Sequence, residues 1–152
     1  KTAYERTVTG VQTCALPIFL FDGNPLPSIE HLATIAANDV VLDPFPYNGN
    51  TATIEALWMG VPVVSLAGSR FIGRMGVDIL NRVGLGDLVA DDVEGYVDAA
   101  VALASDSGRR ADLRRSLRET LRKSVLFDGA AHAKAMEDLF FRLDRDIRRS
   151  GP

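Results

Sequence analysis

The sequence is poor in the residues that build cross-links and metal sites. It has one cysteine, Cys14, and two histidines that lie far apart in the chain. One cysteine cannot form an internal disulfide, and this set of residues does not supply the ligands of a structural zinc site. No apolar run approaches the roughly 18 residues that a membrane-spanning helix needs. We therefore exclude a disulfide scaffold, expect no metal site and expect no contact with a membrane.

An excess of positive charge is also missing. Lys and Arg number 17 against 20 Asp and Glu, which gives a formal net charge of -3. Proteins that bind nucleic acid or other polyanions generally carry a basic excess, so we expect no nucleic-acid partner. With 47% hydrophobic and 24% charged residues in 152 positions, the chain has the composition of one globular domain with a real core.

The first 18 residues differ from the rest of the chain. The segment KTAYERTVTGVQTCALPI (1–18) has neither helical nor strand periodicity. Residues 8–18 can be encoded by the sequence of a common sequencing adapter, and residues 1–5 by the outer part of the same adapter. Residues 6 and 7 would then correspond to its index. The alternative is a natural N-terminal strand, since residues 15–21 are apolar. We expect residues 1–18 to be adapter-derived and the genuine domain to span 19–152, as the C-terminal part of a longer chain.

The next part of the sequence alternates helix and strand patterns. A helix is expected from Ser28 to about residue 37, with one apolar face made by Ile29, Leu32, Ile35 and Ala36. A buried strand is expected at 39–42, because Val40, Val41 and Leu42 form a continuous apolar run of the kind found in parallel strands covered on both faces.

A loop at 43–50 follows, then a helix at 51–59 that Gly60 ends and a second buried strand at 61–66. Strand, helix and strand in so few residues predict a right-handed parallel βαβ unit.

Beyond residue 67 the pattern is mainly helical. Helices are expected at about 71–83, 93–104, 109–124 and 130–149, with a short piece at 87–89; Gly84, Gly86, Gly108 and Gly129 fall between them as stops. The order of these elements predicts a doubly wound α/β half-domain with a C-terminal helical tail.

Residues 48–53 (NGNTAT) lie where the first of these strands leads into a helix. In open α/β sheets that edge is where ligands bind. The first backbone N–H groups of the helix, at Thr51, Ala52 and Thr53, have no partner within it and attract anions, so the junction suits a diphosphate. The threonine hydroxyls add donors, and Gly49 permits close backbone approach. The alternative is that Asn50 or Thr51 merely caps the helix.

Two further side chains extend this candidate site. Glu55 stands one helical turn after Thr51, where its carboxylate can accept hydrogen bonds from two vicinal ribose hydroxyls; alternatively it is a solvated acid that favours the helix dipole. His31, on the preceding helix, can stack on a nucleotide base or be a solvent-exposed histidine.

Basic residues appear in two places. Arg70 and Arg74 follow the second strand and face the same edge, so they are candidates for phosphate or substrate contact or for surface salt bridges. The stretch 109–123 carries seven basic and two acidic residues beside a leucine stripe, which indicates a solvated face over a core seam rather than a nucleic-acid site. Trp58 and Met59 are expected to belong to the hydrophobic core rather than to contact a cofactor.

The run LDPFPYNGNTATIEALWMGVPVVSLAG (42–68) resembles the signature of bacterial O-linked N-acetylglucosamine transferase/SPINDLY-type glycosyltransferases, family 41. The resemblance continues through SIEHLA (28–33), GRMGVDILNRVGLGDLVA (73–90) and LFDGAAHAKAMEDLF (126–140), and covers nearly all of residues 19–152. It implies the Rossmann-like C-terminal half of a two-lobe (GT-B type) catalytic region that follows tetratricopeptide repeats.

By this resemblance Asn50, Thr51 and Ala52 hold the donor pyrophosphate. Glu55 takes the place of the ribose-binding acid, and His31 that of the histidine near the base. Ala52 departs from the pattern, since a hydroxyl residue is usual there, so any contact from it must come through its backbone N–H.

The resemblance implies the donor-binding part of a cytoplasmic, inverting glycosyltransferase that moves a sugar, N-acetylglucosamine from UDP-GlcNAc, to Ser or Thr of a protein bound through upstream repeats. The related fucose transferases share these motifs. The catalytic lysine and histidines of such enzymes lie upstream, so no catalytic residue, cofactor or metal is expected here. The alternatives are a non-catalytic Rossmann-like module for partner binding and a nucleotide-sugar epimerase.

Overall fold

The computed structural model describes residues 28–149, so the expectations for residues 1–18 and for a strand ending near residue 21 lie outside it. Three short strands form a parallel sheet in the order β1-β2-β3. They are β1 (Val41–Leu42), β2 (Val63–Leu66) and β3 (Val89–Ala90). Val41 pairs with Val63, and Ser65 pairs with Val89. The parallel βαβ unit is therefore confirmed.

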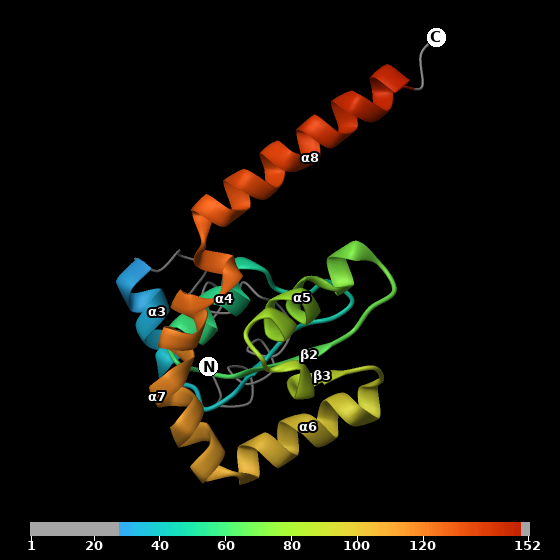
Figure 1. Cartoon of the computed structure of the whole chain (residues 1–152). Coiled ribbons are helices and arrows are strands. Elements are labelled where there is room, and N and C mark those ends of the chain that lie inside the picture. The colour runs from blue at the N-terminus through green and yellow to red at the C-terminus, as the bar shows by residue number, and fades with distance from the viewer. Residues whose placement is uncertain (1–27, 150–152) are drawn as a thin grey trace.

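Helices surround this sheet (Figure 1). Between the strands lie α4 (Thr51–Trp58) and α5 (Met75–Arg82), and α6 (Val93–Ser105) follows β3. Both α5 and α6 pack against β2; in the view of Figure 1 they lie above and below the strands. The remaining helices are α3 (Ser28–Ala36), α7 (Ser107–Lys123) and α8 (Gly129–Arg149), with 3₁₀ turns η1 (Phe71–Gly73), η2 (Gly86–Leu88) and η3 (Val125–Phe127).

The core lies between the central strand and the helices. All four residues of β2 are buried, as expected for a parallel strand covered on both faces. The predicted leucine stripe of the basic helix is part of this core, because Leu117 and Leu121 are buried and Leu113 packs against them. Trp58 and Met59 are half-buried and pack against this core, so their assignment to it is confirmed only in part. The α/β class with C-terminal helices is likewise confirmed.

The first strand was only partly predicted. It is two residues long, and Leu42 is 42% exposed rather than buried. The reason is its position: β1 has a neighbour on one side only among the described residues, and Leu42 is its last residue before the loop. The third strand, β3, was missed because its apolar run is too short to distinguish from a turn.

The helix expected at 71–83 is interrupted. Residues 71–73 form η1, and α5 begins only at Met75. Two carbonyls of η1 are used elsewhere: Ile72 O accepts from Asn48 N at 3.0 Å, and Gly73 O accepts from Gly68 N at 2.7 Å. These contacts with neighbouring loops take the acceptors that a continuous helix would use.

Three smaller expectations were also wrong. Gly108 does not end a helix but lies in the first turn of α7, whose N-cap is Asp106. Gly129 is the first residue of α8 rather than a stop before it. Ile29 was assigned to the apolar face of α3 but is 83% exposed, because no described element covers the first turn.

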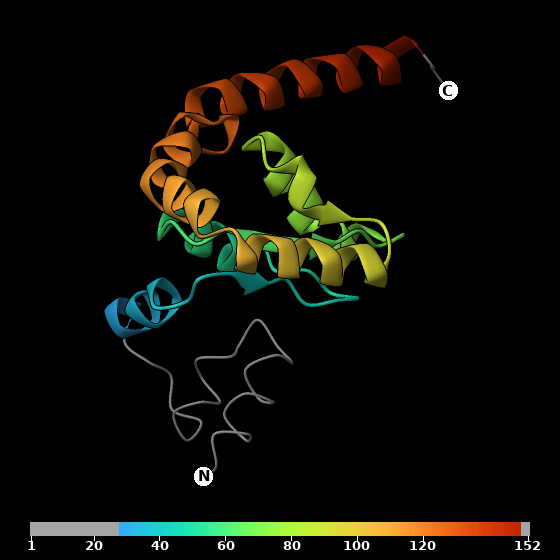
Figure 2. The ribbon, with the colours of Figure 1, turned by 90° about the horizontal axis from the view of Figure 1, so that it is seen from below.

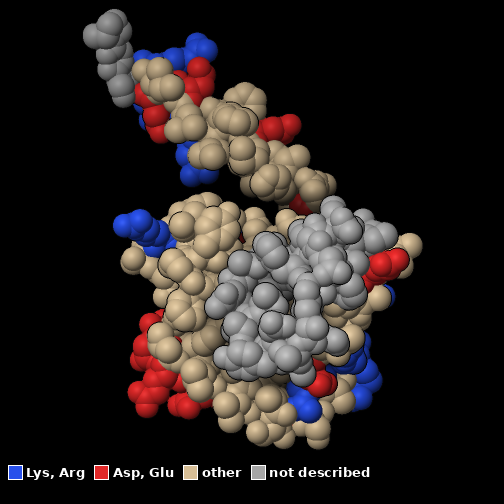
Figure 3. Space-filling model, turned by 180° about the vertical axis from the view of Figure 1, so that it is seen from behind, with Lys and Arg blue, Asp and Glu red and all other residues tan. Residues whose placement is uncertain are grey.

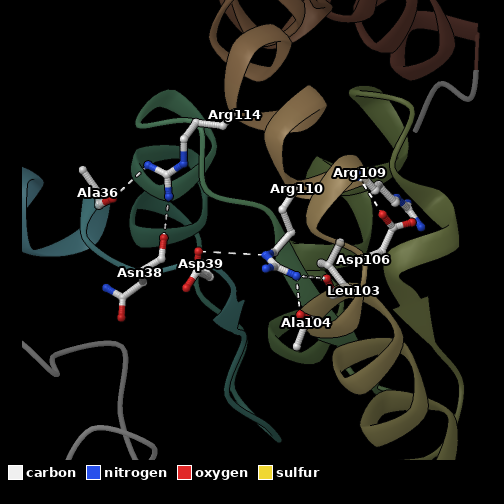
Figure 4. A network of polar contacts seen from close by, with 9 residues as sticks. All are labelled: Ala36, Asn38, Asp39, Leu103, Ala104, Asp106, Arg109, Arg110 and Arg114. Atoms are coloured by element: carbon white, nitrogen blue, oxygen red, sulfur yellow. Dashed lines mark hydrogen bonds and ion pairs between the residues drawn. The ribbon is translucent and has the colours of Figure 1, made fainter.

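The arginines of α7 bind the C-terminal ends of three other helices. Figure 4 shows the contacts of Arg110 and Arg114. Arg114 donates to Ala36 O at 2.9 Å and Asn38 O at 2.6 Å, after the end of α3. Arg118 donates to Trp58 O at 2.8 Å, and Arg110 to Leu103 O at 2.9 Å. The last carbonyls of a helix have no partner within it and form the negative end of its dipole. A guanidinium placed there donates hydrogen bonds to these carbonyls and also brings a positive charge to the negative end. The basic composition of α7 therefore holds helices together.

The end of α4 also lies very close to α7. Gly60 has φ +79°, and a Cβ placed on it would lie 2.8 Å from Arg114 O. Only glycine combines that backbone conformation with that approach.

We expect Arg114→Ala to lower the free energy of unfolding by about 1 to 2 kcal/mol, because two carbonyls at the end of α3 lose a charged donor. The matched control is Arg115→Ala. Among the described residues its guanidinium pairs with the exposed Asp112, so the change should alter stability by less than about 0.5 kcal/mol. Urea unfolding of both variants measures the difference. Equal effects would show that the capping contacts add nothing.

The last helix, α8, projects away from the rest of the molecule (Figures 1 and 2). None of its residues is buried. In the space-filling view its surface carries charges of both signs with uncharged surface between them (Figure 3). Its large exposed apolar side chains are Met136, Leu139, Phe140, Phe141, Leu143 and Ile147. No helix within the described residues is long and apolar enough to cross a membrane.

Candidate functional site

The predicted anion site is the N-terminus of α4. Asn50 occupies the N-cap position, and its side chain makes no capping hydrogen bond. Thr51 is the first helical residue, and the helical ladder starts with Ile54 N donating to Asn50 O at 3.1 Å. Neither the Asn50 nor the Thr51 side chain therefore caps α4. The N–H groups of the first turn are left for a ligand or water.

The two threonines of this turn differ in exposure. Thr51 is exposed, and Ala52 is half-buried. Thr53 is 3% exposed, so the sequence-based expectation of a second hydroxyl donor at the rim is wrong. It faces inward because it shares the buried face of α4 with Ala56 and Leu57. Of these two threonines, only Thr51 offers its hydroxyl at the surface.

Glu55 and His31 are brought together by the packing of α3 on α4. His31 Nε2 lies 3.1 Å from Glu55 Oε2, and the side chains are 26% and 33% exposed. Neither the exposed histidine nor the solvated acid considered from sequence describes this pair. Because a carboxylate only accepts, His31 donates from Nε2. Three of the roughly four lone-pair positions of the Glu55 carboxylate remain for other donors, which is enough for two ribose hydroxyls.

The loop before α4 is tied to the sheet. Gly49 is buried, and its N–H donates to Asp43 Oδ1 at 2.6 Å, so this amide is not available to a ligand. Asn48 is fully buried and donates from Nδ2 to Pro44 O at 3.1 Å. Its backbone N–H donates to Ile72 O at 3.0 Å. These bonds place η1 and the α4 N-terminus at the same edge of the molecule.

Arg70 and Arg74 flank η1 at that edge. Both are exposed, and Arg74 Nη1 donates to Gly68 O at 3.2 Å. Neither forms an ion pair with another described residue, so the salt-bridge alternative gains no support. Their contact with phosphate stays a prediction.

Asp43 is the residue of this region that sequence reasoning missed. It directly follows β1 and is 1% exposed. Ser65 Oγ donates to its Oδ2 at 2.5 Å, and Tyr96 Oη donates to its backbone O at 2.8 Å. Burial raises the pKa of the Asp43 carboxyl, and the hydrogen bonds from Ser65 and Gly49 oppose the rise. The available signal was an acid placed immediately after an apolar strand.

This raised pKa has a consequence for stability. A carboxyl whose pKa is higher in the folded state than in the unfolded state makes folding less favourable when it ionises. Its contribution to the free energy of unfolding is therefore largest at low pH and decreases as pH rises through the folded pKa. Asp43→Asn does not titrate. We expect the stability of this variant relative to the parent to increase as pH rises from the ordinary carboxyl range through the raised pKa. Urea unfolding across that pH range measures it; a relative stability that falls with pH would contradict the sign.

The described residues include no group of three or more His, Cys, Asp or Glu that could hold a metal ion. The polar groups at the edge are instead backbone N–H donors, one threonine hydroxyl, two arginines and the His31–Glu55 pair. Such a set binds anions and polyhydroxyl groups.

The family model described as "Glycosyl transferase family 41" matches residues 18–136. The chain belongs to this family. The match includes β1, the loop, α4 and both members of the His31–Glu55 pair, so the site described above lies within the family's domain.

Curated relatives include several proteins named as N-acetylglucosaminyltransferases. The chain is 43% identical over 111 residues to a probable UDP-N-acetylglucosamine–peptide N-acetylglucosaminyltransferase SPINDLY of Solanum lycopersicum, covering 73% of this chain and 12% of the relative. It is 33% identical over 110 residues to the UDP-N-acetylglucosamine–peptide N-acetylglucosaminyltransferase of Caenorhabditis elegans, covering 72% and 10%. The chain thus spans a small part of the length of these relatives.

A solved structure is similar as well. A mutant of the O-GlcNAc transferase of Thermobaculum terrenum matches with a TM-score of 0.74 and 43% identity, over 80% of this chain and 24% of that chain. The arrangement of parallel sheet and helices is therefore that of a segment of a family-41 transferase.

Proposed function

We propose that this chain is the donor-binding part of a glycosyltransferase that moves N-acetylglucosamine from a nucleotide diphosphate sugar, UDP-GlcNAc, to Ser or Thr of a protein. The N–H groups of the first turn of α4 and the Thr51 hydroxyl would bind the diphosphate. Glu55 would accept from the ribose hydroxyls, with His31 next to it near the base. Arg70 and Arg74 would add positive charge at the same edge.

The chemistry needs a site for a leaving diphosphate. The acceptor hydroxyl oxygen forms a bond to the anomeric carbon, the bond from that carbon to the phosphate oxygen breaks, and the diphosphate takes the electron pair. The hydroxyl proton passes to a base that we place outside this chain. Helix N–H groups stabilise the charge that grows on the departing oxygen, because they are already aligned when it appears.

One observation carries the proposal: an uncapped first turn of α4 at the carboxyl edge of a parallel sheet, in a chain that belongs to family 41. The names of the relatives support the donor and the protein acceptor. The upstream repeats that bind the acceptor and the cytoplasmic location stay predictions.

Calorimetric titration of this chain with UDP, UDP-GlcNAc, uridine and inorganic pyrophosphate tests the proposal. We expect saturable binding of UDP and UDP-GlcNAc, with uridine and pyrophosphate each weaker because each makes part of the contacts. No binding of UDP or UDP-GlcNAc would contradict the proposal and favour a partner-binding module without nucleotide chemistry.

We also expect this chain alone to transfer no sugar, because no residue in it matches the catalytic lysine and histidines implied by the resemblance. The measurement is incorporation of radiolabelled N-acetylglucosamine from UDP-GlcNAc into a mixture of proteins. Turnover by the purified chain would contradict the assignment of catalysis to upstream residues.

A further inference from the structure

The donor site contains a buried acid that the proposed chemistry does not use. Asp43 is 1% exposed, and no Lys, Arg or His among the described residues pairs with it. A carboxylate buried without a cation is costly, and its burial raises the pKa of the group. A purely apolar residue would fill the same space without this cost, so the carboxylate needs a local reason.

Its bonds supply that reason. Oδ1 accepts from Gly49 N at 2.6 Å, and Oδ2 accepts from Ser65 Oγ at 2.5 Å. The first turn of α5 lies directly against Oδ2, since a Cβ on Gly76 would be 2.2 Å from it. The positive end of a helix there offsets part of the cost of the buried charge. A loop and a strand thus donate to one carboxylate, and a helix packs against it.

Asp43 is itself fixed to the sheet. Its N–H donates to Val64 O at 2.9 Å, and its carbonyl accepts from Tyr96 Oη at 2.8 Å. At the other end, Gly49 immediately precedes Asn50, the N-cap of α4. The bond from Oδ1 to the Gly49 amide therefore joins the two ends of the loop between β1 and α4, next to the N-terminus of α4.

We propose that Asp43 is a positioning residue for the nucleotide-sugar donor, which sets the α4 N-terminus against the diphosphate by holding Gly49. This inference rests on the proposed function. It predicts a change in diphosphate affinity, on removal of the Asp43 side chain, that is opposite in sign to the change expected from charge alone. Removing a negative charge from beside an anion site should strengthen binding of a diphosphate, whereas loss of the positioning bond weakens it.

Three variants of this chain separate positioning from general stability. Asp43→Ala removes the acceptor of Gly49 N. Ser65→Ala removes the other bond of the same buried carboxylate but leaves the bond to Gly49. Asp43→Asn keeps both, because its amide oxygen accepts from Gly49 N and its amide nitrogen donates to Ser65 Oγ.

The readouts are UDP affinity by calorimetry and hydrogen exchange of the Gly49 amide. We expect Asp43→Ala to weaken UDP binding at least about tenfold and to lose protection of Gly49. Ser65→Ala should stay within about twofold of the parent despite a similar loss of melting temperature, and Asp43→Asn within about threefold. Should Asp43→Ala fail to fold, Asp43→Ser makes the same comparison, since its shorter side chain does not reach Gly49.

The inference is overturned if folded Asp43→Ala or Asp43→Ser binds UDP as the parent does, or if Ser65→Ala loses as much affinity as Asp43→Ala. Failure of the parent chain to bind UDP is a different result, because it overturns the proposed function and this inference with it. A parent that binds UDP and an Asp43→Ala variant that binds equally well overturn the inference alone.

Discussion

Gly76→Ala should lower the free energy of unfolding by roughly 2 to 4 kcal/mol. The added methyl group would lie 2.2 Å from Asp43 Oδ2 and 2.5 Å from Ser65 Oγ. Both neighbours are buried and bonded to each other, so neither can move without breaking the hydrogen bond between them. The gain in helix propensity of about 1 kcal/mol does not offset this collision. Thermal and urea unfolding measure the loss.

Gly129→Ala is the matched control. Gly129 also lies near the start of a helix, but a Cβ on it meets nothing within 4 Å. Its stability should stay within about 0.5 kcal/mol of the parent or rise slightly. If Gly76→Ala is as stable as Gly129→Ala, α5 does not pack as closely against the Asp43 carboxylate as the structure shows.

Glu55→Gln should weaken UDP binding by about 1 to 3 kcal/mol, or about 5- to 150-fold, because a charged acceptor for the ribose hydroxyls becomes a neutral one. The change preserves the shape and the helix propensity of the side chain. Its effect on stability should be small, since the pair with His31 is partly exposed to solvent. Calorimetric titration compares the variant with the parent.

The control uses the ligand rather than the protein. A 2′,3′-dideoxy analogue of UDP lacks the hydroxyls, so the parent and Glu55→Gln should bind it nearly equally. A variant that loses the same affinity for UDP and for the dideoxy analogue would place Glu55 away from the ribose.

The alternative role of Thr51 as a helix cap is wrong, because Asn50 holds the N-cap position and Thr51 is the first helical residue. Any effect of Thr51→Val should therefore appear in ligand affinity rather than in unfolding.

The position of the candidate site in the fold could be predicted because it follows from local rules. Buried strands leading into helices fix a parallel sheet, and the edge at the ends of its strands is where α4 begins. Residues 48–53 and Glu55 were placed there from spacing alone. The roles assigned to Asn50, Thr51 and Ala52 stay predictions.

The partners of these residues could not be predicted, because they come from distant parts of the chain. Glu55 meets His31 only when α3 packs on α4, and Asp43 meets Ser65 only when β1 pairs beside β2. Periodicity shows which face of a helix is buried but not which element covers it. The same limit hid the capping arginines: the bonds of Arg114 reach back to the end of α3.

We expect the nucleotide diphosphate to bind at the N-terminus of α4. The most direct test is to follow the backbone amide resonances of this chain by NMR during titration with UDP. We expect saturable shifts that are largest at Thr51, Ala52 and Thr53, whose N–H groups would face the diphosphate, and small shifts along α8. Shifts centred on another element, or none that saturate, would contradict it.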